Sequence, residues 1–289
     1  MDLSIYGGTG TIGSYYHGLY GGDVIDRKTL APSSSQVLYL ISTTDNYNIY
    51  TDPTLDVSTN LLELTKRLEA CRTAGVKEFN FISSWYVYGK DLHFFHEESV
   101  CHPNGFYPIT KYAAERLVIE FCQTFNITWR ILRLCNVYGT IDQLVSPKRN
   151  FLHWCLQNLD EESPVILFKD VHRDYLHIFD LCRAINLILT KGRKNIIYNV
   201  ASGMERNLLD LVLTGKAFLE SSSKVDTCDA PTSYRQHLRN RFSTERLRDL
   251  GFRPMIGMEE GLLDLCRVQK YCTPDRILTV PKFKQLFAP

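Results

Sequence analysis

Apolar residues in the first 200 positions alternate between short continuous runs and longer stretches with helical spacing. The run VLYLIS at 37–42 is typical of a buried strand, whereas apolar residues in 57–74 recur every three or four positions. Strands are expected at 3–6, 24–25, 37–42, 78–83, 129–134 and 196–200, and helices at 57–74, 107–125 and 179–190. Strands and helices that alternate in this way predict an α/β fold, a doubly wound parallel sheet covered on both faces.

Beyond about residue 140 this alternation becomes less regular. A helix is expected at 150–159 and a short strand at 165–168. The region 205–270 shows two or three helical patterns separated by a polar loop at 221–232. A second, smaller part of the molecule is therefore expected after the main sheet.

Composition indicates an ordinary soluble protein. The 33 basic and 32 acidic residues give a net charge of +1, which predicts neither a nucleic-acid nor a membrane-surface partner. No basic leader or long apolar stretch suggests export or a membrane span, so a cytoplasmic location is expected. Nine cysteines, an odd number without a C-x-x-C pair, argue against a disulfide framework and against a metal site.

A glycine-rich turn, GGTGTIG, directly follows the first expected strand. Gly7, Gly10 and Gly13 are spaced by three residues. Such glycines allow a tight turn, close approach of the backbone to a pyrophosphate, and close packing of helix on strand. Thr11 and Ile12 then lie at a helix N-terminus, where amide groups face phosphate charge. In this context the turn predicts a dinucleotide site.

Asp26 lies 19 residues after Gly7, at the end of the second expected strand. An acid there accepts the ribose hydroxyls of NAD, and its charge repels the 2′-phosphate of NADP. Arg27 follows directly and could pair with that phosphate, so NAD is preferred and NADP stays open. Asp26 could also be a simple turn residue. Glycines between Gly13 and Asp26 predict a short first helix.

Tyr107 and Lys111 are four residues apart in an expected helix, which places both on one face. An ammonium one turn away is expected to lower the tyrosine pKa, so that the phenolate can accept a proton from an alcohol. The same spacing joins Tyr86 and Lys90, but that segment is a strand end closed by Gly89, where this spacing does not align side chains.

Ser84 supports the choice of Tyr107. It follows the expected strand at 78–83, and the carboxyl end of a strand lies on the ligand side of a doubly wound sheet. Its hydroxyl could bind the same substrate oxygen that Tyr107 deprotonates. Ser83 is the alternative, as a residue that caps the strand end.

Together these features resemble the extended short-chain dehydrogenase/reductase family, the NAD-dependent nucleotide-sugar epimerases and dehydratases. The resemblance implies a Rossmann-like fold with an NAD(P)-binding domain at 1–139, to which 174–200 return. Residues 140–173 and 201–289 would form the smaller C-terminal substrate-binding portion. The matching segments are GGTGTIG (7–13), Asn60 in TNLLEL, 75–89, YPITK (107–111), RLCNVYG (133–139), RDYLHIFD (173–180), YNVASG (198–203) and LGFRP (250–254).

The resemblance also implies roles for single residues. Ser84, Tyr107 and Lys111 would be catalytic, and Lys111 would also hold the nicotinamide ribose. Asn136 and Arg173 would bind the sugar or diphosphate of a nucleotide-sugar substrate, although a turn or an ion pair with Asp174 could explain them. The cofactor-binding set is Gly7, Gly10, Thr11, Ile12, Gly13, Asp26, Arg27, Ser42, Asn60, Tyr107 and Lys111, and the substrate-binding set is Ser84, Tyr86, Asn136 and Arg173.

The two positions after Ser84 bear on the reaction. Family members that dehydrate the sugar carry an acidic pair there, and this chain has Trp85 and Tyr86. Tyr86 could act as an acid or simply form a pocket wall. Hydride chemistry at one carbon remains: an NAD-dependent epimerase with a transient keto intermediate is preferred, and a ketoreductase or dehydrogenase, or a non-catalytic dinucleotide sensor, are the alternatives. Family members also suggest a homodimer through the helices at 57–74 and 107–125.

Overall fold

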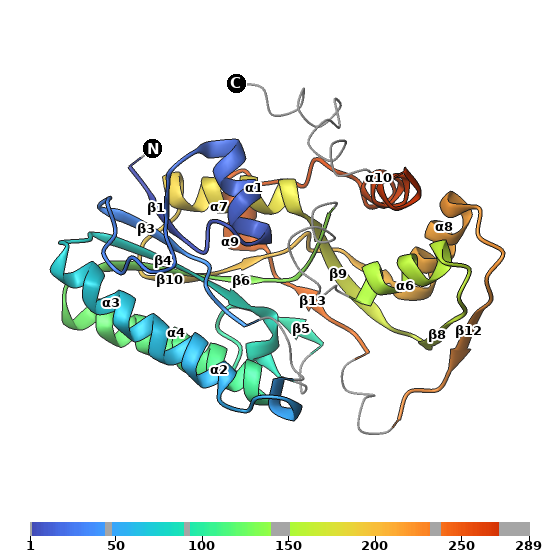
Figure 1. Ribbon diagram of the computed structural model, residues 1–289, viewed down its shortest axis with the longest axis horizontal. Helices are drawn as coiled ribbons and strands as arrows, with labels where there is room; N and C mark the ends of the chain where they lie inside the picture. The colour runs from blue at the N-terminus through green and yellow to red at the C-terminus, as the bar shows by residue number, and fades with distance from the viewer. Residues whose placement is uncertain (1, 44–47, 90–92, 140–150, 232–237, 272–289) are drawn as a thin grey trace.

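A parallel sheet of six strands forms the centre of the molecule (Figure 1). The computed structural model describes residues 2–43, 48–89, 93–139, 151–231 and 238–271, with side chains to 266. The strands are β1 (Ser4–Tyr6), β2 (Asp23–Ile25), β3 (Gln36–Tyr39), β4 (Glu78–Ser84), β6 (Thr128–Leu134) and β10 (Ile196–Val200). They pair in the order β10-β6-β4-β3-β1-β2, all parallel.

Helices cover both faces of this sheet, as Figure 1 shows. Helices α1 (Thr11–Tyr20) and α7 (Ile178–Lys191) pack on one face, with a core that contains Leu3, Ile5 and Tyr16. Helices α3 (Glu63–Thr73) and α4 (Phe106–Thr124) pack on the other. The predicted doubly wound α/β fold is therefore confirmed.

The strand order defines where a ligand can bind. Strand β1 has β2 on one side and β3 on the other, so the chain changes direction between β1 and β3. In open α/β sheets the ligand crevice lies at the carboxyl ends of the strands at such a switch point. The glycine turn follows β1 at this edge. Residues 27–35 link β2 to β3 without a helix or strand of their own, and we call this segment the strap.

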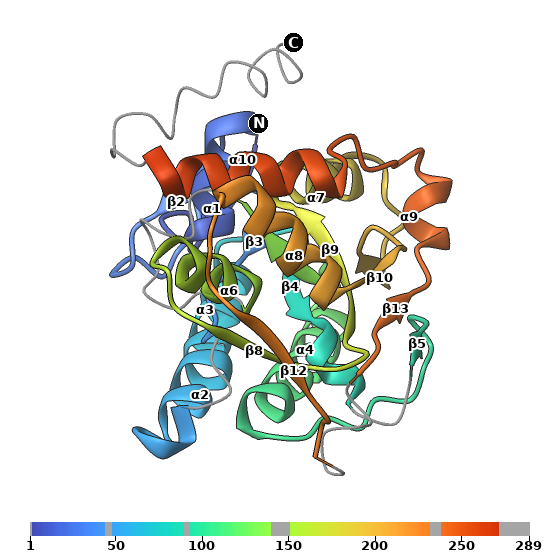
Figure 2. The same cartoon turned by 90° about the vertical axis from the view of Figure 1, so that its right-hand side faces the viewer.

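The smaller part of the molecule contains a second hydrophobic core. Figures 1 and 2 show its helices and the β8–β12 pair at one end of the sheet. Its elements are α6 (Phe151–Asp160), β8 (Val165–Phe168), α8 (Leu208–Leu219), β12 (Val225–Cys228) and α10 (Met258–Tyr271). The strands between it and the sheet are β5 (Phe94–Phe95), β7 (Asn136–Tyr138), β9 (His172–His177), β11 (Glu205–Asn207) and β13 (Arg241–Phe242). Helix α9 (Glu245–Asp249) packs on β10 of the main sheet. The domain boundaries given above stay a prediction.

Two expectations about local structure were wrong. The polar segment 221–232 was expected to be a loop, but it contains β12, which pairs with β8. The helix expected at 57–74 begins earlier, at Leu55, and a π-helical turn over Ser58–Leu62 interrupts it before α3. The side chain of Asn60 in that turn bonds to neighbouring segments, which favours the irregular geometry.

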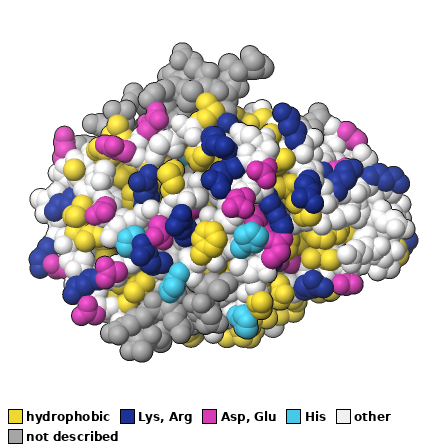
Figure 3. Space-filling view, turned by 180° about the vertical axis from the view of Figure 1, so that it is seen from behind, with side chains coloured by type: hydrophobic (Ala, Val, Ile, Leu, Met, Phe, Trp, Pro, Cys, Tyr) yellow, Lys and Arg dark blue, Asp and Glu magenta, His cyan; other side chains and the backbone are white. Residues whose placement is uncertain are grey.

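Surface and cysteines add little to the functional picture. The eight cysteines that the structure describes are all free, and Cys272 lies outside the described residues. On the face drawn in Figure 3, basic and acidic side chains are interspersed. None of the helices in the described part of the chain has the length and apolar character needed to cross a lipid bilayer.

Candidate active site

The glycine turn after β1 has the geometry that a pyrophosphate requires. Gly7 has a φ of +80°, which favours glycine, and a Cβ on Gly13 would lie only 2.3 Å from the carbonyl oxygen of Gly7. Helix α1 begins at Thr11 with no side chain capping its amides and no acid in its first turn. Free amides and the positive end of the helix dipole favour an anion. The residues present therefore fit a dinucleotide phosphate.

Asp26 and Arg27 lie exposed just beyond the carboxyl end of β2. The Asp26 carboxylate accepts a hydrogen bond from the Lys28 amide at 2.8 Å, so it does serve a turn. The Arg27 carbonyl accepts one from Arg67 of α3 at 3.0 Å. Strand β2 pairs with β1, which leads into the glycine turn, so Asp26 and Arg27 follow β2 at the edge where an adenosine ribose would be expected.

Asn60 ties three segments together beneath the expected cofactor site. Its amide nitrogen donates to Thr43 at 2.8 Å and to Thr110 of α4 at 3.0 Å. Its oxygen accepts from the Ser42 hydroxyl and the Thr43 amide, both at 3.0 Å. The end of β3 and the first turns of α4 are thereby fixed to the π-helical turn. Thr43 and Thr110 were not predicted as site residues, because no motif in the sequence marks them.

Tyr107 is buried in the first turn of α4, and its hydroxyl lies near the hydroxyls of Ser84 and Ser42. Ser84 and Tyr107, chosen from the sequence, do converge. Burial raises the pKa of Tyr107 to about 12, and the Ser84 and Ser42 hydroxyls act in the opposite direction. We expected Lys111 to lower the pKa of Tyr107, and this expectation is wrong. Desolvation of the phenolate raises the pKa by more than the neighbouring hydroxyls lower it.

Lys111 is fully enclosed one turn along α4. Its ammonium donates to the Ile82 carbonyl at 2.7 Å and lies 4.2 Å from the centre of the Phe81 ring. Burial lowers the pKa of Lys111 to about 7, while the nearby Glu115 carboxylate raises it. The second tyrosine–lysine spacing cannot be compared, since Lys90 lies outside the described residues.

A buried ion pair supports this face of α4. Arg133 of β6 donates two hydrogen bonds, of 3.0 and 2.7 Å, to the Glu115 carboxylate. The Ser83 hydroxyl donates to the same carboxylate at 2.5 Å. Ser83 thus belongs to the supporting network and Ser84 to the site. Glu115 was missed in the sequence, although it follows Lys111 by one helical turn on the same face.

Aromatic side chains form the wall opposite Tyr107. Tyr86 meets Tyr107 edge to face, with ring centres 6.0 Å apart, and stacks on Trp85 at 4.2 Å. The Arg173 guanidinium lies 6.0 Å from the centre of the Trp85 ring. The positions after Ser84 therefore bring no carboxylate to the site.

Asn136 and Arg173 are less directly placed. Asn136 donates to the Asp174 carbonyl at 3.1 Å, and Arg173 donates to the Leu238 carbonyl at 2.9 Å. The Asp174 carboxylate is bound instead by Ser202, through both its amide and its hydroxyl. Arg173 reaches the aromatic wall, whereas Asn136 contacts the strand beside it.

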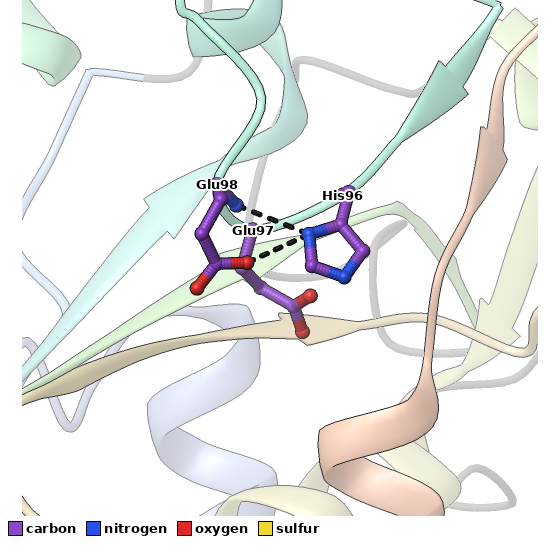
Figure 4. Close-up of side chains that lie close together, drawn as sticks. All are labelled: His96, Glu97 and Glu98. Atoms are coloured by element: carbon purple, nitrogen blue, oxygen red, sulfur yellow. Dashed lines mark hydrogen bonds and ion pairs between the residues drawn. The ribbon is translucent and has the colours of Figure 1, made fainter.

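One group of metal-ligand residue types occurs in the described part of the chain, His96 with Glu97 and Glu98 (Figure 4). Each acid already has a protein partner. Glu98 pairs with Arg246 and lies 2.6 Å from His96, and Glu97 accepts from the Asn199 amide at 3.0 Å. These contacts fix the segment before α4 to β10.

The buried ammonium of Lys111 predicts a pH-dependent cost to stability. Between about pH 7 and 10.5 the unfolded chain binds more protons at this residue than the folded protein, so its cost falls as pH rises. Lys111→Met is expected to raise the free energy of unfolding by roughly 1–4 kcal/mol at pH 6, and less at pH 9. Urea denaturation of both proteins at the two pH values measures this. A gain that does not change with pH would contradict the shifted pKa.

Comparison with known proteins agrees with this fold. Residues 19–201, more than half of the chain, match the NAD dependent epimerase/dehydratase family. The matched range begins after the glycine turn.

Two curated relatives have similar sequence identity to this chain. The chain is 27% identical over 250 residues to a dTDP-glucose 4,6-dehydratase of Streptomyces antibioticus, covering 83% of this chain and 72% of the relative. It is 28% identical over 236 residues to a GDP-6-deoxy-D-mannose reductase of Pseudomonas aeruginosa, covering 78% and 77%.

Solved structures show the same fold. A UDP-glucose 4-epimerase of Thermotoga maritima with UDP-glucose superimposes with a TM-score of 0.79 at 21% identity, covering 92% of this chain and 98% of that one. Other structures of similar fold were solved with NAD or NADPH. The chain therefore belongs to the NAD-dependent epimerase/dehydratase family, within the extended short-chain dehydrogenases/reductases.

Proposed function

We propose that this protein performs hydride chemistry at one carbon of a nucleotide-diphosphate sugar, with NAD or NADP as its cofactor. The observation that carries the proposal is the convergence of the Tyr107, Ser84 and Ser42 hydroxyls. They meet at the carboxyl edge of the sheet, where the glycine turn fits a pyrophosphate. A sensor that only binds dinucleotide has no need for this set.

In this proposal, Ser84 and Tyr107 hold one oxygen of the sugar between them. Tyr107 takes the proton of a sugar hydroxyl, or returns it to a ketone. Lys111 holds the nicotinamide ribose and places a cation one helical turn from the Tyr107 hydroxyl. When bound, the nicotinamide accepts or donates the hydride. Ser42 lies near the tyrosine hydroxyl and is held in place by the hydrogen bond that it donates to the Asn60 amide oxygen.

The substrate class rests on Arg173 and Asn136. The Arg173 guanidinium, held over Trp85, suits the diphosphate of a nucleotide sugar because a planar guanidinium binds phosphate oxygens in pairs. The relatives act on dTDP- and GDP-linked sugars, and the epimerase structure contains UDP-glucose. We extend this chemistry, without a choice of sugar or base, to the present chain.

The reaction has two forms that use the same residues, an epimerase with a transient keto sugar and a ketoreductase or dehydrogenase. Dehydration, the reaction named for the Streptomyces relative, is disfavoured, because Trp85 and Tyr86 cannot supply the acid pair. Tyr86 lies against Tyr107 as a wall of the pocket.

The test uses purified protein with NAD(H) or NADP(H) and a panel of UDP-, GDP- and dTDP-linked sugars and 4-keto sugars. We expect either a new epimer by nuclear magnetic resonance or a change in absorbance at the reduced-nicotinamide band. Dinucleotide binding without any turnover on the whole panel would favour the sensor.

A homodimer is part of the proposal. The outer face of α4 exposes Phe106, Ile109 and Leu117, and Leu62 lies exposed on the turn before α3. A second copy of the chain could cover this face in a four-helix arrangement. Ile109→Glu should then convert a dimer to a monomer by light scattering, whereas Leu213→Glu, at an exposed leucine of α8, should not. A wild-type monomer would contradict the proposal.

A further inference from the structure

The first half of the sheet is shorter than a dinucleotide-binding sheet usually is. In the usual order 3-2-1-4-5-6, a third strand lies beyond the second, and a helix leads into it. In the described residues β2 is the edge strand, with only β1 beside it, and it has three residues. The chain passes from β2 to β3 through the strap at 27–35, all of which is described.

Side chains of β1 and α3 bind the strap near both of its ends. Near the carboxyl end of β1, the Tyr6 hydroxyl donates to the Leu30 carbonyl, and Arg67 donates to the Arg27 carbonyl at 3.0 Å. Near the start of β1, the Ser4 hydroxyl oxygen accepts from the amides of Ser33 and Ser34 at 2.9 and 3.0 Å.

These contacts have a direct consequence for the cofactor site. The strap runs down the α3/α4 face of β1 in place of a helix. Since its backbone is held at both ends, it cannot also form a wall beyond the edge of β2.

Among the described residues, no strand pairs with the outer edge of β2. The five residues from Asp26 to Leu30 are all exposed, and four of them are polar. The Asp26 carboxylate, the group expected at the adenosine ribose, already accepts the Lys28 amide. The pyrophosphate turn, by contrast, is closely packed around Gly13. The nicotinamide side is also enclosed, because Tyr107 and Lys111 are buried.

We propose that the protein binds the pyrophosphate and the nicotinamide half of its dinucleotide and leaves the adenine base largely in solvent. The cofactor then dissociates and is replaced in each turnover. A base that packs against one surface at most contributes little binding energy and little selectivity. At a dissociation constant of ~1 µM and an association rate of ~10⁶ M⁻¹ s⁻¹, release takes about a second, within the range of ordinary turnover.

This inference rests on the proposed function and selects between its two forms. An epimerase restores its cofactor in every cycle and gains nothing from release. A net oxidation removes a hydride from the sugar carbon to the dinucleotide and a proton from its oxygen to Tyr107; a net reduction reverses both. Each turnover then converts one dinucleotide, which must leave. An exchanging site therefore fits a nucleotide-sugar ketoreductase or dehydrogenase.

The test compares dinucleotides that differ only in the base. Dissociation constants of NAD⁺, nicotinamide guanine dinucleotide and 1,N⁶-etheno-NAD⁺ are measured by calorimetry on full-length protein from which nucleotides have been removed. We expect the three values to agree within about threefold. A guanine dinucleotide that binds more than about tenfold more weakly than NAD⁺ would show an enclosed adenine and overturn the inference.

A second measurement examines exchange. Freshly purified protein is desalted, denatured and analysed for released NAD(H) and NADP(H) by chromatography. We expect far less than one dinucleotide per chain, while near-stoichiometric retention would overturn the inference and leave the proposed function, in its epimerase form, intact. Folded protein that binds none of the three dinucleotides would contradict both proposals.

Discussion

Replacement of Tyr107 by phenylalanine is expected to lower turnover by roughly 10²–10⁴-fold and to change dinucleotide affinity by less than about threefold. The Tyr107 hydroxyl lies near both Ser84 and Ser42, so its loss removes proton transfer without removing the aromatic ring. Turnover is followed with the substrate found in the panel described above, and affinity by calorimetry.

Tyr86→Phe is the matched control for this variant. Its ring lies edge to face against that of Tyr107, so the control removes a neighbouring hydroxyl and keeps the packing. We expect it to retain turnover within about tenfold. Equal losses in the two variants would show that Tyr107 is not the specific acid/base.

Arg133→Met is expected to destabilise the fold by about 3–5 kcal/mol. The Glu115 carboxylate is buried in the sheet–helix interface, and without Arg133 it keeps only the Ser83 hydroxyl and the more distant charge of Lys111. An uncompensated buried charge carries a cost of this size. Urea denaturation at pH 7, with the slope checked for a constant value, measures the loss.

The double variant Glu115→Leu, Arg133→Met tests the origin of that loss. Removal of both charges should recover most of the stability, because replacement of a buried pair by apolar residues is often nearly neutral. Additive losses in the two single variants and the double one would mean that packing, rather than charge, accounts for the effect. Arg133 lies 4.7 Å from the centre of the Tyr88 ring, which is the packing contact at stake.

The sequence predicted the sheet well because each of its strands contains a short apolar run. The run at 78–83 and the run at 129–134 became β4 and β6, the two most extensively paired strands. Ser84 and Tyr107 could be predicted because Ser84 lies at the end of an expected strand and Tyr107 at the start of an expected helix. The glycine turn could be predicted because its glycines are the residues that such a turn requires.

Other features depend on contacts that no local pattern reveals. Strand β9 was missed because its sequence is largely polar and charged, and it is stabilised by the Asp174 bonds and by pairing with β7 and β11. The π-helical turn depends on Asn60 and its distant partner Thr110. The pKa of Tyr107 was expected in the wrong direction because burial, unlike spacing, is a property of the whole fold.

The two adjacent serines at the end of β4 have a consequence for how this site can evolve. Successive side chains of a strand point to opposite faces, so Ser83 serves the Glu115 pair and Ser84 serves Tyr107. The role of each serine thus depends on its position in the alternation of side chains along β4, because the two residues are chemically the same. Insertion or loss of a single residue within β4 would turn Ser84 away from Tyr107 and Ser83 away from Glu115. A homologue with such a change would lose activity although both serines are still present in its sequence.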